Sequence, residues 1–312
     1  NVRPRLRLYD TGVGAVADIV ADVQAAGAEF IVGPLTREEV MAAADQLTTR
    51  PPMLALNFLP PDRAAPQRFY QFALSPEDDA RAVARYLGAS GRRRGVVLTP
   101  EGDWGARVAA AFDEELRSAG GYVLGQASYI AADNDYRASI MHVLRTDDST
   151  AREQRVQAAI GQRLNTDHQP RRRADIQFIF APSQPGVARV LRPQLRFHFA
   201  GDIPTYTLGD AYEPHPANKE IDGVMFPDMP WMIGDAGLSA EVREAASRGF
   251  GDSGPRRGRL FAFGYDAFRI AASLQRGSPV NPQGLTGTLS MDAQGRVRRE
   301  LQWVRIQDGT PA

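Results

Sequence analysis

The 312-residue chain contains no cysteine, which excludes disulfides, thiolate metal sites and cysteine nucleophiles. Histidine is scarce as well, and the four residues lie far apart, at His142, His168, His198 and His215. None forms the closely spaced pair that a helical metal site uses. No apolar run approaches the roughly 18 residues of a membrane-spanning helix. We therefore expect a soluble globular domain with no metal site.

An excess of charge of one sign is also lacking. Lys+Arg and Asp+Glu both number 37, so the formal net charge is +0 and no global field attracts nucleic acid. The sequence has no Gly-x-Ser-x-Gly pentad, no Gly-x-Gly-x-x-Gly fingerprint and no Gly-Lys-Ser/Thr phosphate loop. With no assembled nucleophile, acid pair or cofactor motif, the sequence predicts a protein that is not an enzyme, with no catalytic residue, no cofactor and no nucleic-acid partner.

Short apolar strands alternate with amphipathic helices along most of the chain. Strands are expected over 4–9, 29–32, 53–56, 95–99, 122–129, 176–180, 205–208 and 223–226. Helices are expected over 16–26, 37–47, 76–87, 105–119, 136–144, 186–195, 239–248 and 264–275. Such alternation is typical of an α/β protein with parallel sheets, and this length favours two lobes. The segments 285–289 and 299–306 are expected to form antiparallel strands.

A strongly polar insertion, 145–175, interrupts this alternation. Within it Val156, Ile160 and Leu164 recur at four-residue spacing, which predicts one short amphipathic helix. Two interpretations stay open. The insertion is either a solvated excursion or a surface on which a partner docks.

Two arginine triplets each precede a predicted strand. One is 92–94, and the other is Arg171, Arg172 and Arg173. Both could be solvated loop ends, or they could attract an anionic partner such as a phosphate, a carboxylate or a polyanionic cell-wall polymer through forces that salt screens. We take Arg171, Arg172 and Arg173 as candidate partner-docking residues.

Ligands of open parallel sheets bind beyond the carboxyl ends of the strands, where helix N-termini present unpaired amides. The residues at these predicted ends are the cleft and ligand-binding candidates. They are Thr36, Asn57, Ser75, Thr99, Trp104, Ser183 and Asp210. Thr36 and Ser75 also have the chemistry of helix N-caps, so capping is the alternative for both.

Four segments resemble the branched-chain amino-acid-binding type of periplasmic binding protein. They are 31–35 (IVGPL), 72–80 (FALSPEDDA), 264–267 (GYDA) and 284–289 (GLTGTL). The resemblance implies a type I periplasmic-binding-protein fold, in which two Rossmann-like lobes with parallel sheets flanked by helices are joined by three crossover segments. Lobe 1 is expected over 1–74 and 229–292, and lobe 2 over 75–228 and 293–312.

A closer resemblance is to the LppC family. It is carried by 32–35 with 54–57, by 72–80, and by a stretch from 171–176 through 202–204 (DIP) to 226–231 (FPDMPW). The last stretch is the most specific, because a generic solute binder has no need for an arginine-led strand or a Met-Pro-Trp crossing.

Membership of that family implies a non-enzymatic regulator of peptidoglycan synthesis, a lipoprotein that activates a bifunctional class A penicillin-binding protein. Its expected place is the periplasmic side of the outer membrane in a Gram-negative bacterium, with a lipid anchor in an N-terminal part outside this chain. The family's opening strand and helix are expected to precede Pro4. Besides the synthase, peptidoglycan or a small cleft ligand is a further candidate partner.

The cleft positions depart from those of amino-acid binders. Pro60 and Pro61 stand where the resemblance implies a hydroxyl, and Ser183 stands where an aromatic is usual, although Asp210 keeps a carboxylate. A bound carboxylate would lose a hydrogen bond, which disfavours a free amino acid as ligand. The alternative function is a periplasmic solute-binding or sensing protein that closes its lobes over a small polar ligand, such as an amino acid or cell-wall fragment, with Trp104 as an apolar wall.

Overall fold

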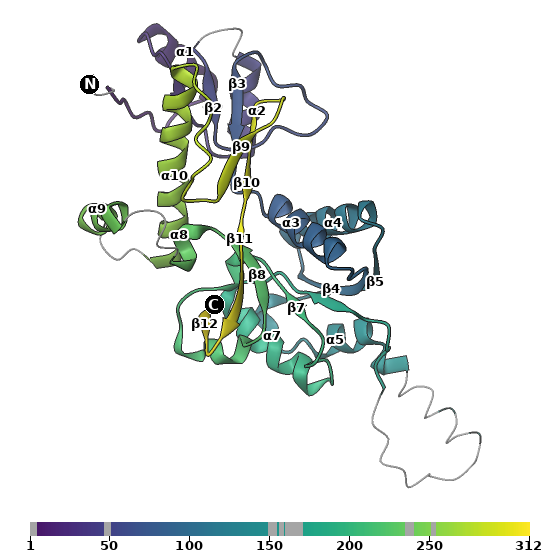
Figure 1. Cartoon of the computed structure of the whole chain (residues 1–312). Helices are drawn as coiled ribbons and strands as arrows, with labels where there is room; N and C mark the ends of the chain where they lie inside the picture. Colours follow the sequence, from purple (N-terminus) through teal and green to yellow (C-terminus); the bar gives the residue numbers. More distant parts are fainter. Residues whose placement is uncertain are drawn as a thin grey trace. The chain divides into compact units, whose positions relative to one another are not determined.

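The computed structural model describes residues 5–46, 51–148, 155, 159, 171–234, 240–250 and 254–312. The chain folds into two compact units (Figure 1). Unit 1 comprises Asn1–Ser75 and Pro230–Glu300, and unit 2 comprises Pro76–Met229 and Leu301–Ala312. Residues 293–300, which the sequence assigns to the second lobe, belong to unit 1 because strand β10 (Arg296–Glu300) pairs with strands of that unit.

Unit 1 is built on a five-stranded mixed sheet of order β1-β2-β3-β10-β9. Its other strands are β1 (Ile31–Val32), β2 (Met53–Ala55), β3 (Phe69–Phe72) and β9 (Thr288–Met291). Its helices are α1 (Val16–Ala25), α2 (Arg37–Gln46), α8 (Pro230–Ile233), α9 (Ala240–Phe250) and α10 (Gly254–Gln275). Neighbouring strands run parallel from β1 to β10, and β9 is antiparallel to β10.

Successive residues of β2 point to opposite faces of this sheet and so enter two separate cores. Met53 packs in a cluster with Val40 of α2, whereas Leu54 packs in a cluster with Phe72 and Phe263. The rings of Phe72 and Phe263 have centroids 4.8 Å apart, which fixes α10 on its face of the sheet. Helices therefore cover both faces of the unit 1 sheet.

Unit 2 is built on a seven-stranded sheet of order β12-β11-β8-β7-β6-β4-β5. Its strands are β4 (Arg94–Pro100), β5 (Tyr122–Tyr129), β6 (Phe178–Phe180), β7 (Thr205–Tyr206), β8 (Met225–Asp228), β11 (Gln302–Gln307) and β12 (Thr310–Pro311). Its α-helices are α3 (Pro76–Ala89), α4 (Asp103–Ser118), α5 (Arg137–Leu144) and α7 (Pro185–Phe197). Its short 3-10 helices are η1 (Ala131–Asp133), η2 (Gly209–Ala211) and η3 (Pro216–Ile221). The strands from β8 to β5 are parallel, and β11 and β12 add an antiparallel edge.

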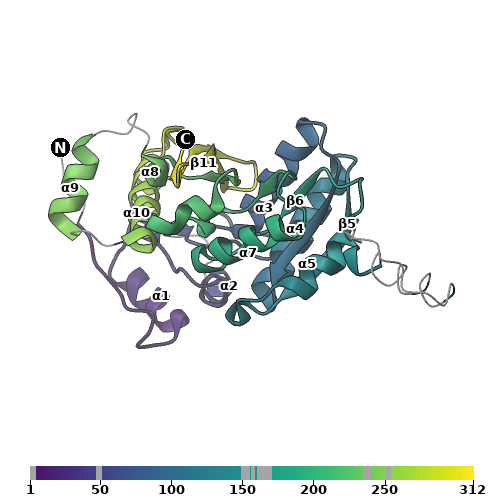
Figure 2. The ribbon, with the colours of Figure 1, turned by 90° about the horizontal axis from the view of Figure 1, so that it is seen from below.

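Alternation along β4 again divides the core between two helical layers. Val97 lies in the cluster that contains the inward faces of α3 and α4, and Val96 and Leu98 lie in the cluster that contains those of α5 and α7. Figure 1 shows α3 and α4 on one side of the strands and α5 and α7 on the other, and Figure 2 shows α5 and α7 from below. Because the strands from β8 to β5 are parallel, their carboxyl ends lie at one edge of this sheet.

The predicted α/β class with helix-flanked sheets is confirmed, and both sheets are mixed rather than wholly parallel. The predicted strand over 4–9 is wrong for its described part, because residues 5–9 pair with no strand and Leu8 is 98% exposed. β3, β12 and most of β10 were not predicted, and the expected strand 299–306 spans the end of β10 and most of β11, which lie in different sheets. Helix α10 begins ten residues earlier than expected, at Gly254 rather than Gly264. The expected amphipathic helix at 156–164 falls almost wholly outside the described residues.

Candidate functional site

The three unit 1 candidates follow strand ends, and two of them are used by the fold itself. The amide of Thr36 donates to Oε2 of Glu39 at 3.1 Å, and the amide of Glu39 donates to Oγ1 of Thr36 at 3.3 Å. This reciprocal pair is a capping box at the start of α2. Burial raises the pKa of Glu39, but hydrogen bonds from Thr11 and from Thr36 outweigh it and lower the pKa overall. Nδ2 of Asn57 donates to the carbonyl of Leu35 at 3.0 Å. Ser75 is half-buried and directly precedes α3.

Thr99 and Trp104 lie at the carboxyl end of β4 in unit 2. Thr99 is 2% exposed, and half-buried Trp104 packs against the core under α3 and α4. The close approach of α4 to the strand depends on Gly105, since a Cβ there would lie 2.0 Å from the carbonyl oxygen of Pro100. Trp104 thus has a packing role, which the ligand-wall prediction did not include.

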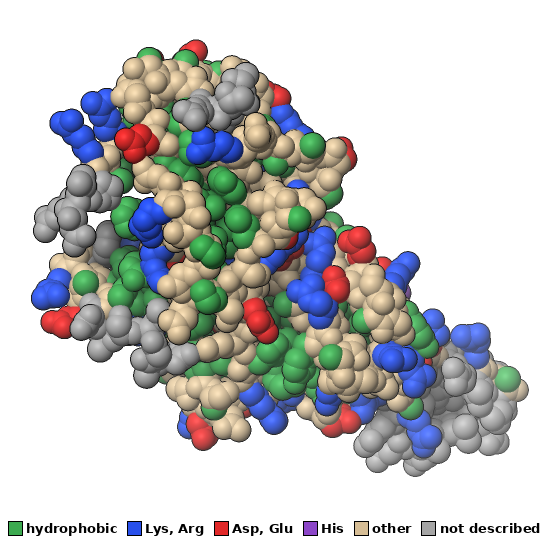
Figure 3. Space-filling view, turned by 45° about the horizontal axis from the view of Figure 1, so that its top comes forward, with side chains coloured by type: hydrophobic (Ala, Val, Ile, Leu, Met, Phe, Trp, Pro, Cys, Tyr) green, Lys and Arg blue, Asp and Glu red, His purple; other side chains and the backbone are tan. Residues whose placement is uncertain are grey.

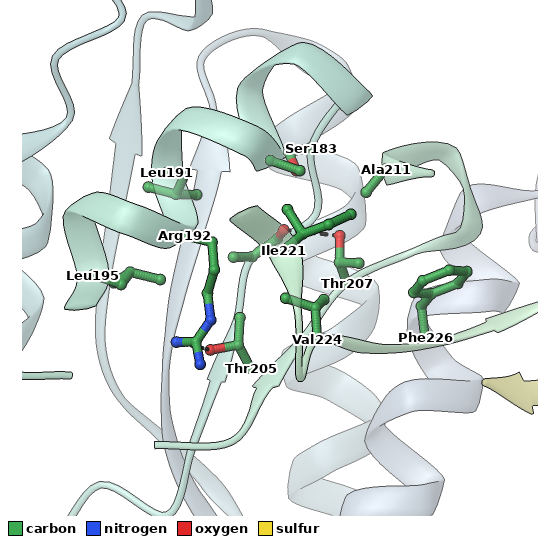
Figure 4. Close-up of a pocket in the computed structure, with 12 residues that line it drawn as sticks. Ser183, Leu191, Arg192, Leu195, Thr205, Thr207, Ala211, Ile221, Val224 and Phe226 are labelled. Carbon is green, nitrogen blue, oxygen red and sulfur yellow. Dashed lines mark hydrogen bonds between the residues drawn. The ribbon is translucent and has the colours of Figure 1, made fainter. Parts of the chain in front are cut away.

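Ser183 and Asp210 follow β6 and β7. Ser183 is 2% exposed, and its Oγ has no hydrogen-bond partner among the described residues. It lines a small, mostly apolar cavity between α7 and the sheet, together with Thr207 and Ala211 (Figure 4). The space that can hold the centre of a water molecule is only ≈ 20 Å³, about enough for one water. Asp210 is exposed in η2 and does not line this cavity.

The arginine triplet does not act as one surface. Arg173 pairs with both carboxylate oxygens of Asp175, at 2.7 and 2.8 Å, and donates to the carbonyl of Leu124 at 3.0 Å. The hydrogen-bonded pairing with Asp175 raises the pKa of Arg173, and the same pairing lowers the pKa of Asp175. Arg172 pairs with Asp202 at 2.6 Å, whereas Arg171 is exposed. Two of the three candidate docking residues therefore hold neighbouring loops in place.

Two of the segments that resemble periplasmic binding proteins, 264–267 and 284–289, meet at one buried carboxylate in unit 1. Asp266, on α10, is 0% exposed and accepts hydrogen bonds from the amides of Leu285 and Thr286, at 2.9 and 2.7 Å. Thr286 Oγ1 donates a third, at 2.7 Å. Gly284 permits this approach, since a Cβ there would lie 2.7 Å from Oδ2 of Asp266. These motifs therefore join α10 to the segment before β9.

The Met-Pro-Trp crossing also has a structural role. Trp231 in α8 packs against Phe261 of α10, with ring centroids 5.1 Å apart. The guanidinium of Arg243 lies 4.4 Å from the centroid of a Trp231 ring, within cation–π distance, and donates to the carbonyl of Trp231 at 3.0 Å. Trp231 therefore ties α8, α9 and α10 together within unit 1.

Sequence reasoning missed Arg192, which lies in α7. Figure 4 shows its side chain extending away from Ser183 toward Thr205, where Nη1 donates to Oγ1 at 3.3 Å. An arginine in an amphipathic helix resembles a surface residue. Its spacing from Ala188 and Leu195, four and three residues away on the buried face, is the signal that could have placed it inside.

Within the described ranges, no three His, Asp or Glu side chains are grouped closely enough to hold a metal ion. No helix formed by these residues combines the length and apolar character required to cross a membrane. The face shown in Figure 3 carries basic and acidic side chains interspersed.

Two units of this architecture, each with a mainly parallel sheet between helical layers, are typical of the type I periplasmic-binding-protein fold. An ABC transporter substrate-binding protein from Desulfitobacterium hafniense has the same fold, with a TM-score of 0.60, 18% identity, and coverage of 96% of this chain and 83% of that one. The sequence identifies the family more narrowly than the fold does. It matches the family model "LppC putative lipoprotein" over residues 1–309, and the chain belongs to the LppC family.

Curated relatives and solved structures agree with this membership. A penicillin-binding protein activator, LpoA, from Photobacterium profundum is 29% identical over 320 residues, which cover 98% of this chain and 51% of the relative. The LpoA C-domain from Haemophilus influenzae, described as a regulator of PBP1A, aligns with a TM-score of 0.70 and 24% identity over 97% of this chain and 88% of that one. The chain spans about half the length of the curated relatives it matches.

Proposed function

We propose that this chain is a non-enzymatic regulator of peptidoglycan synthesis that activates a class A penicillin-binding protein. The observation that carries the proposal is the LppC family match over residues 1–309, together with curated relatives described as penicillin-binding protein activators. We place the protein on the periplasmic side of the outer membrane, where a lipid-anchored activator could reach a synthase in the inner membrane.

The environments of the candidate residues support a binding role rather than catalysis. A nucleophile needs a base within hydrogen-bond reach, and the Oγ of Ser183 has no partner among the residues described. Thr36 and Asn57 are bound to their own neighbouring backbone. A regulator needs a surface that binds its partner and needs no reacting group, which agrees with the environments of Ser183, Thr36 and Asn57.

The same contacts argue against the solute-binding alternative. A ligand that bonded to Nδ2 of Asn57 would compete with the carbonyl of Leu35, and one that bonded to Thr36 would weaken the cap of α2. Besides the synthase, we keep peptidoglycan and a small cleft ligand as further candidate partners of the protein. A thermal shift with amino acids, peptides or muropeptides would favour them, because a ligand that binds only the folded state raises its stability.

The decisive experiment measures binding of the chain to the periplasmic region of a class A penicillin-binding protein from the same organism, and the synthase's glycan polymerisation and cross-linking rates. Saturable binding with faster synthesis is expected. Arg171→Ala should weaken binding if the triplet is the contact, and Arg93→Ala, an exposed arginine elsewhere, is the matched control. Arg173→Ala is not a suitable test of the contact, because the Arg173 side chain also bonds to Asp175 and to the carbonyl of Leu124, so its loss would disturb the local structure. Absence of both binding and stimulation would overturn the proposal.

A further inference from the structure

A second pocket of unit 2 lies at the opposite edge of the sheet from the candidate residues. Its lining includes Arg92 just before β4, Pro204 just before β7, and Gly223 two residues before β8. These are the amino ends of the parallel strands, whereas ligands of this fold class bind beyond the carboxyl ends. With a volume of ≈ 310 Å³, the pocket is at the lower limit of the usual range for small-molecule sites, about 300–1,000 Å³.

The pocket is rich in positive charge. Arg92, Arg192 and Arg305 line it, and Asp202 is its one acidic lining residue. Asp202 is already paired with Arg172 at 2.6 Å. Across the parts of the chain that the structure describes, none of the three lining arginines forms an ion pair with a carboxylate. The pocket therefore offers cationic groups without a matching protein anion.

Two buried polar groups of the lining have unused hydrogen-bonding capacity. Arg192 is 8% exposed; its Nη1 and Nη2 donate to Thr205 Oγ1 and to the carbonyl of Gly201, at 3.3 and 2.9 Å, but its Nε has no partner. Tyr206 is 0% exposed, and its hydroxyl has no partner either. Such groups are rare in folded proteins, because burying a polar group without a hydrogen bond is unfavourable. Their shared place in one pocket calls for an explanation.

Arg192 keeps its charge despite this burial. Burial and the neighbouring Arg196 lower the pKa of Arg192 to about 10, against the opposing effect of Asp202. The guanidinium is therefore protonated at neutral pH. Beside it, Tyr86 and Tyr206 give the pocket an aromatic wall, and Trp303 stacks on Tyr86 with ring centroids 3.9 Å apart. A charged group and a rigid apolar wall together fit a small organic anion.

We propose that this pocket binds a small ligand through its carboxylate or phosphate oxygens, with Arg92, Arg192 and Arg305 supplying the positive charge and Tyr206 a hydroxyl donor. Guanidinium groups match the geometry of both kinds of oxyanion. The pocket shares only Arg192 with the lining of the Ser183 cavity, and it goes beyond the activator role, which does not require it. The competing account is that Arg192 only satisfies neighbouring protein groups, as it does at the carbonyl of Gly201.

The test is isothermal titration of the 312-residue chain at constant ionic strength set with chloride. The probes are inorganic phosphate, N-acetyl-alanyl-alanine with a free carboxylate, and the amide of that dipeptide as the uncharged control. Saturable binding of phosphate or of the carboxylate is expected, and the stronger of the two identifies the oxyanion. The amide should not bind.

The variants Arg305→Gln and Tyr206→Phe should each weaken binding about tenfold, the loss expected for one hydrogen bond to a charged group. Arg305 is exposed, and the Tyr206 hydroxyl has no protein partner, so both variants should fold. Arg93→Gln is the matched control, because Arg93 is adjacent to Arg92 in sequence but does not line the pocket. The proposal fails if neither anion binds up to about 10 mM, or if Arg93→Gln weakens binding as much as the two pocket variants.

Discussion

Each unit buries a charged side chain on a helix that packs against its sheet, and the two are satisfied to different degrees. In unit 1, Asp266 receives three hydrogen bonds from Leu285 and Thr286. In unit 2, Arg192 makes two hydrogen bonds, leaves Nε unused and has no ion pair within the described chain. A fully satisfied buried charge indicates a structural joint, whereas an incompletely satisfied one indicates a place for something else to bind.

Removing the satisfied charge should have the largest effect. Asp266→Ala leaves three donors of Leu285 and Thr286 buried without an acceptor, and we expect a loss of about 3–5 kcal/mol in the free energy of unfolding. Urea denaturation measures it, with exposed Asp22→Ala in the same unit as control, which should change stability by less than about 0.5 kcal/mol. A loss below about 1 kcal/mol for Asp266→Ala would contradict the structural role.

An intermediate effect is expected at the half-exposed pair of Arg173 and Asp175. Arg173→Ala should cost about 1–2 kcal/mol at neutral pH, because it removes the pair and the hydrogen bond to Leu124. Arg173 lowers the pKa of Asp175 below 3.8, so the stability from this pair is present above that value and is lost as the pH falls through the folded-state pKa. The difference in the free energy of unfolding between the unaltered chain and the Arg173→Ala variant, measured by urea denaturation, should therefore shrink in acid. A difference that stayed constant would exclude the ion pair as its cause.

The smallest effect on stability is expected for Arg192, the buried charge of unit 2 that is incompletely satisfied. Arg192→Met keeps much of the side-chain volume and removes a buried charge that lacks a carboxylate partner, so stability should change by less than about 1 kcal/mol in either direction. Oxyanion binding measured by titration should fall at least tenfold in the same variant. If Arg192→Met destabilised the chain as much as Asp266→Ala, Arg192 would be a structural residue like its counterpart in unit 1.

The periodicity of the sequence predicted most helices and central strands, because buried and exposed residues alternate with the period of each element. It missed β3, whose apolar run is interrupted by Gln71, a buried residue that accepts a hydrogen bond from the amide of Leu59 at 2.7 Å. It also predicted a strand where residues 5–9 find no neighbour, since alternation indicates a half-buried surface but names no partner strand.

Among the candidate sites too, those set by local sequence could be predicted and those set by the assembled fold could not. The Thr36 cap could be foreseen, because a threonine followed three residues later by a glutamate is a local signal. The oxyanion pocket could not, because Arg92, Arg192 and Arg305 come from segments that only the assembled sheet brings together. The sequence indicated an anion at both arginine triplets, 92–94 and 171–173, and it could not tell that Arg92 is the member that lines a cavity.

The packing of the aromatic residues has a spectroscopic consequence. The chain has three tryptophans, and Trp231 reports on unit 1 while Trp104 and Trp303 report on unit 2. Trp231 sits beside the guanidinium of Arg243, whereas Trp303 stacks on Tyr86. Replacing Trp231 with phenylalanine would leave tryptophan fluorescence from unit 2 alone, so comparison with the unaltered chain would give the order in which the two units melt, without an attached dye. Trp303 would at the same time sense any ligand that settles against Tyr86.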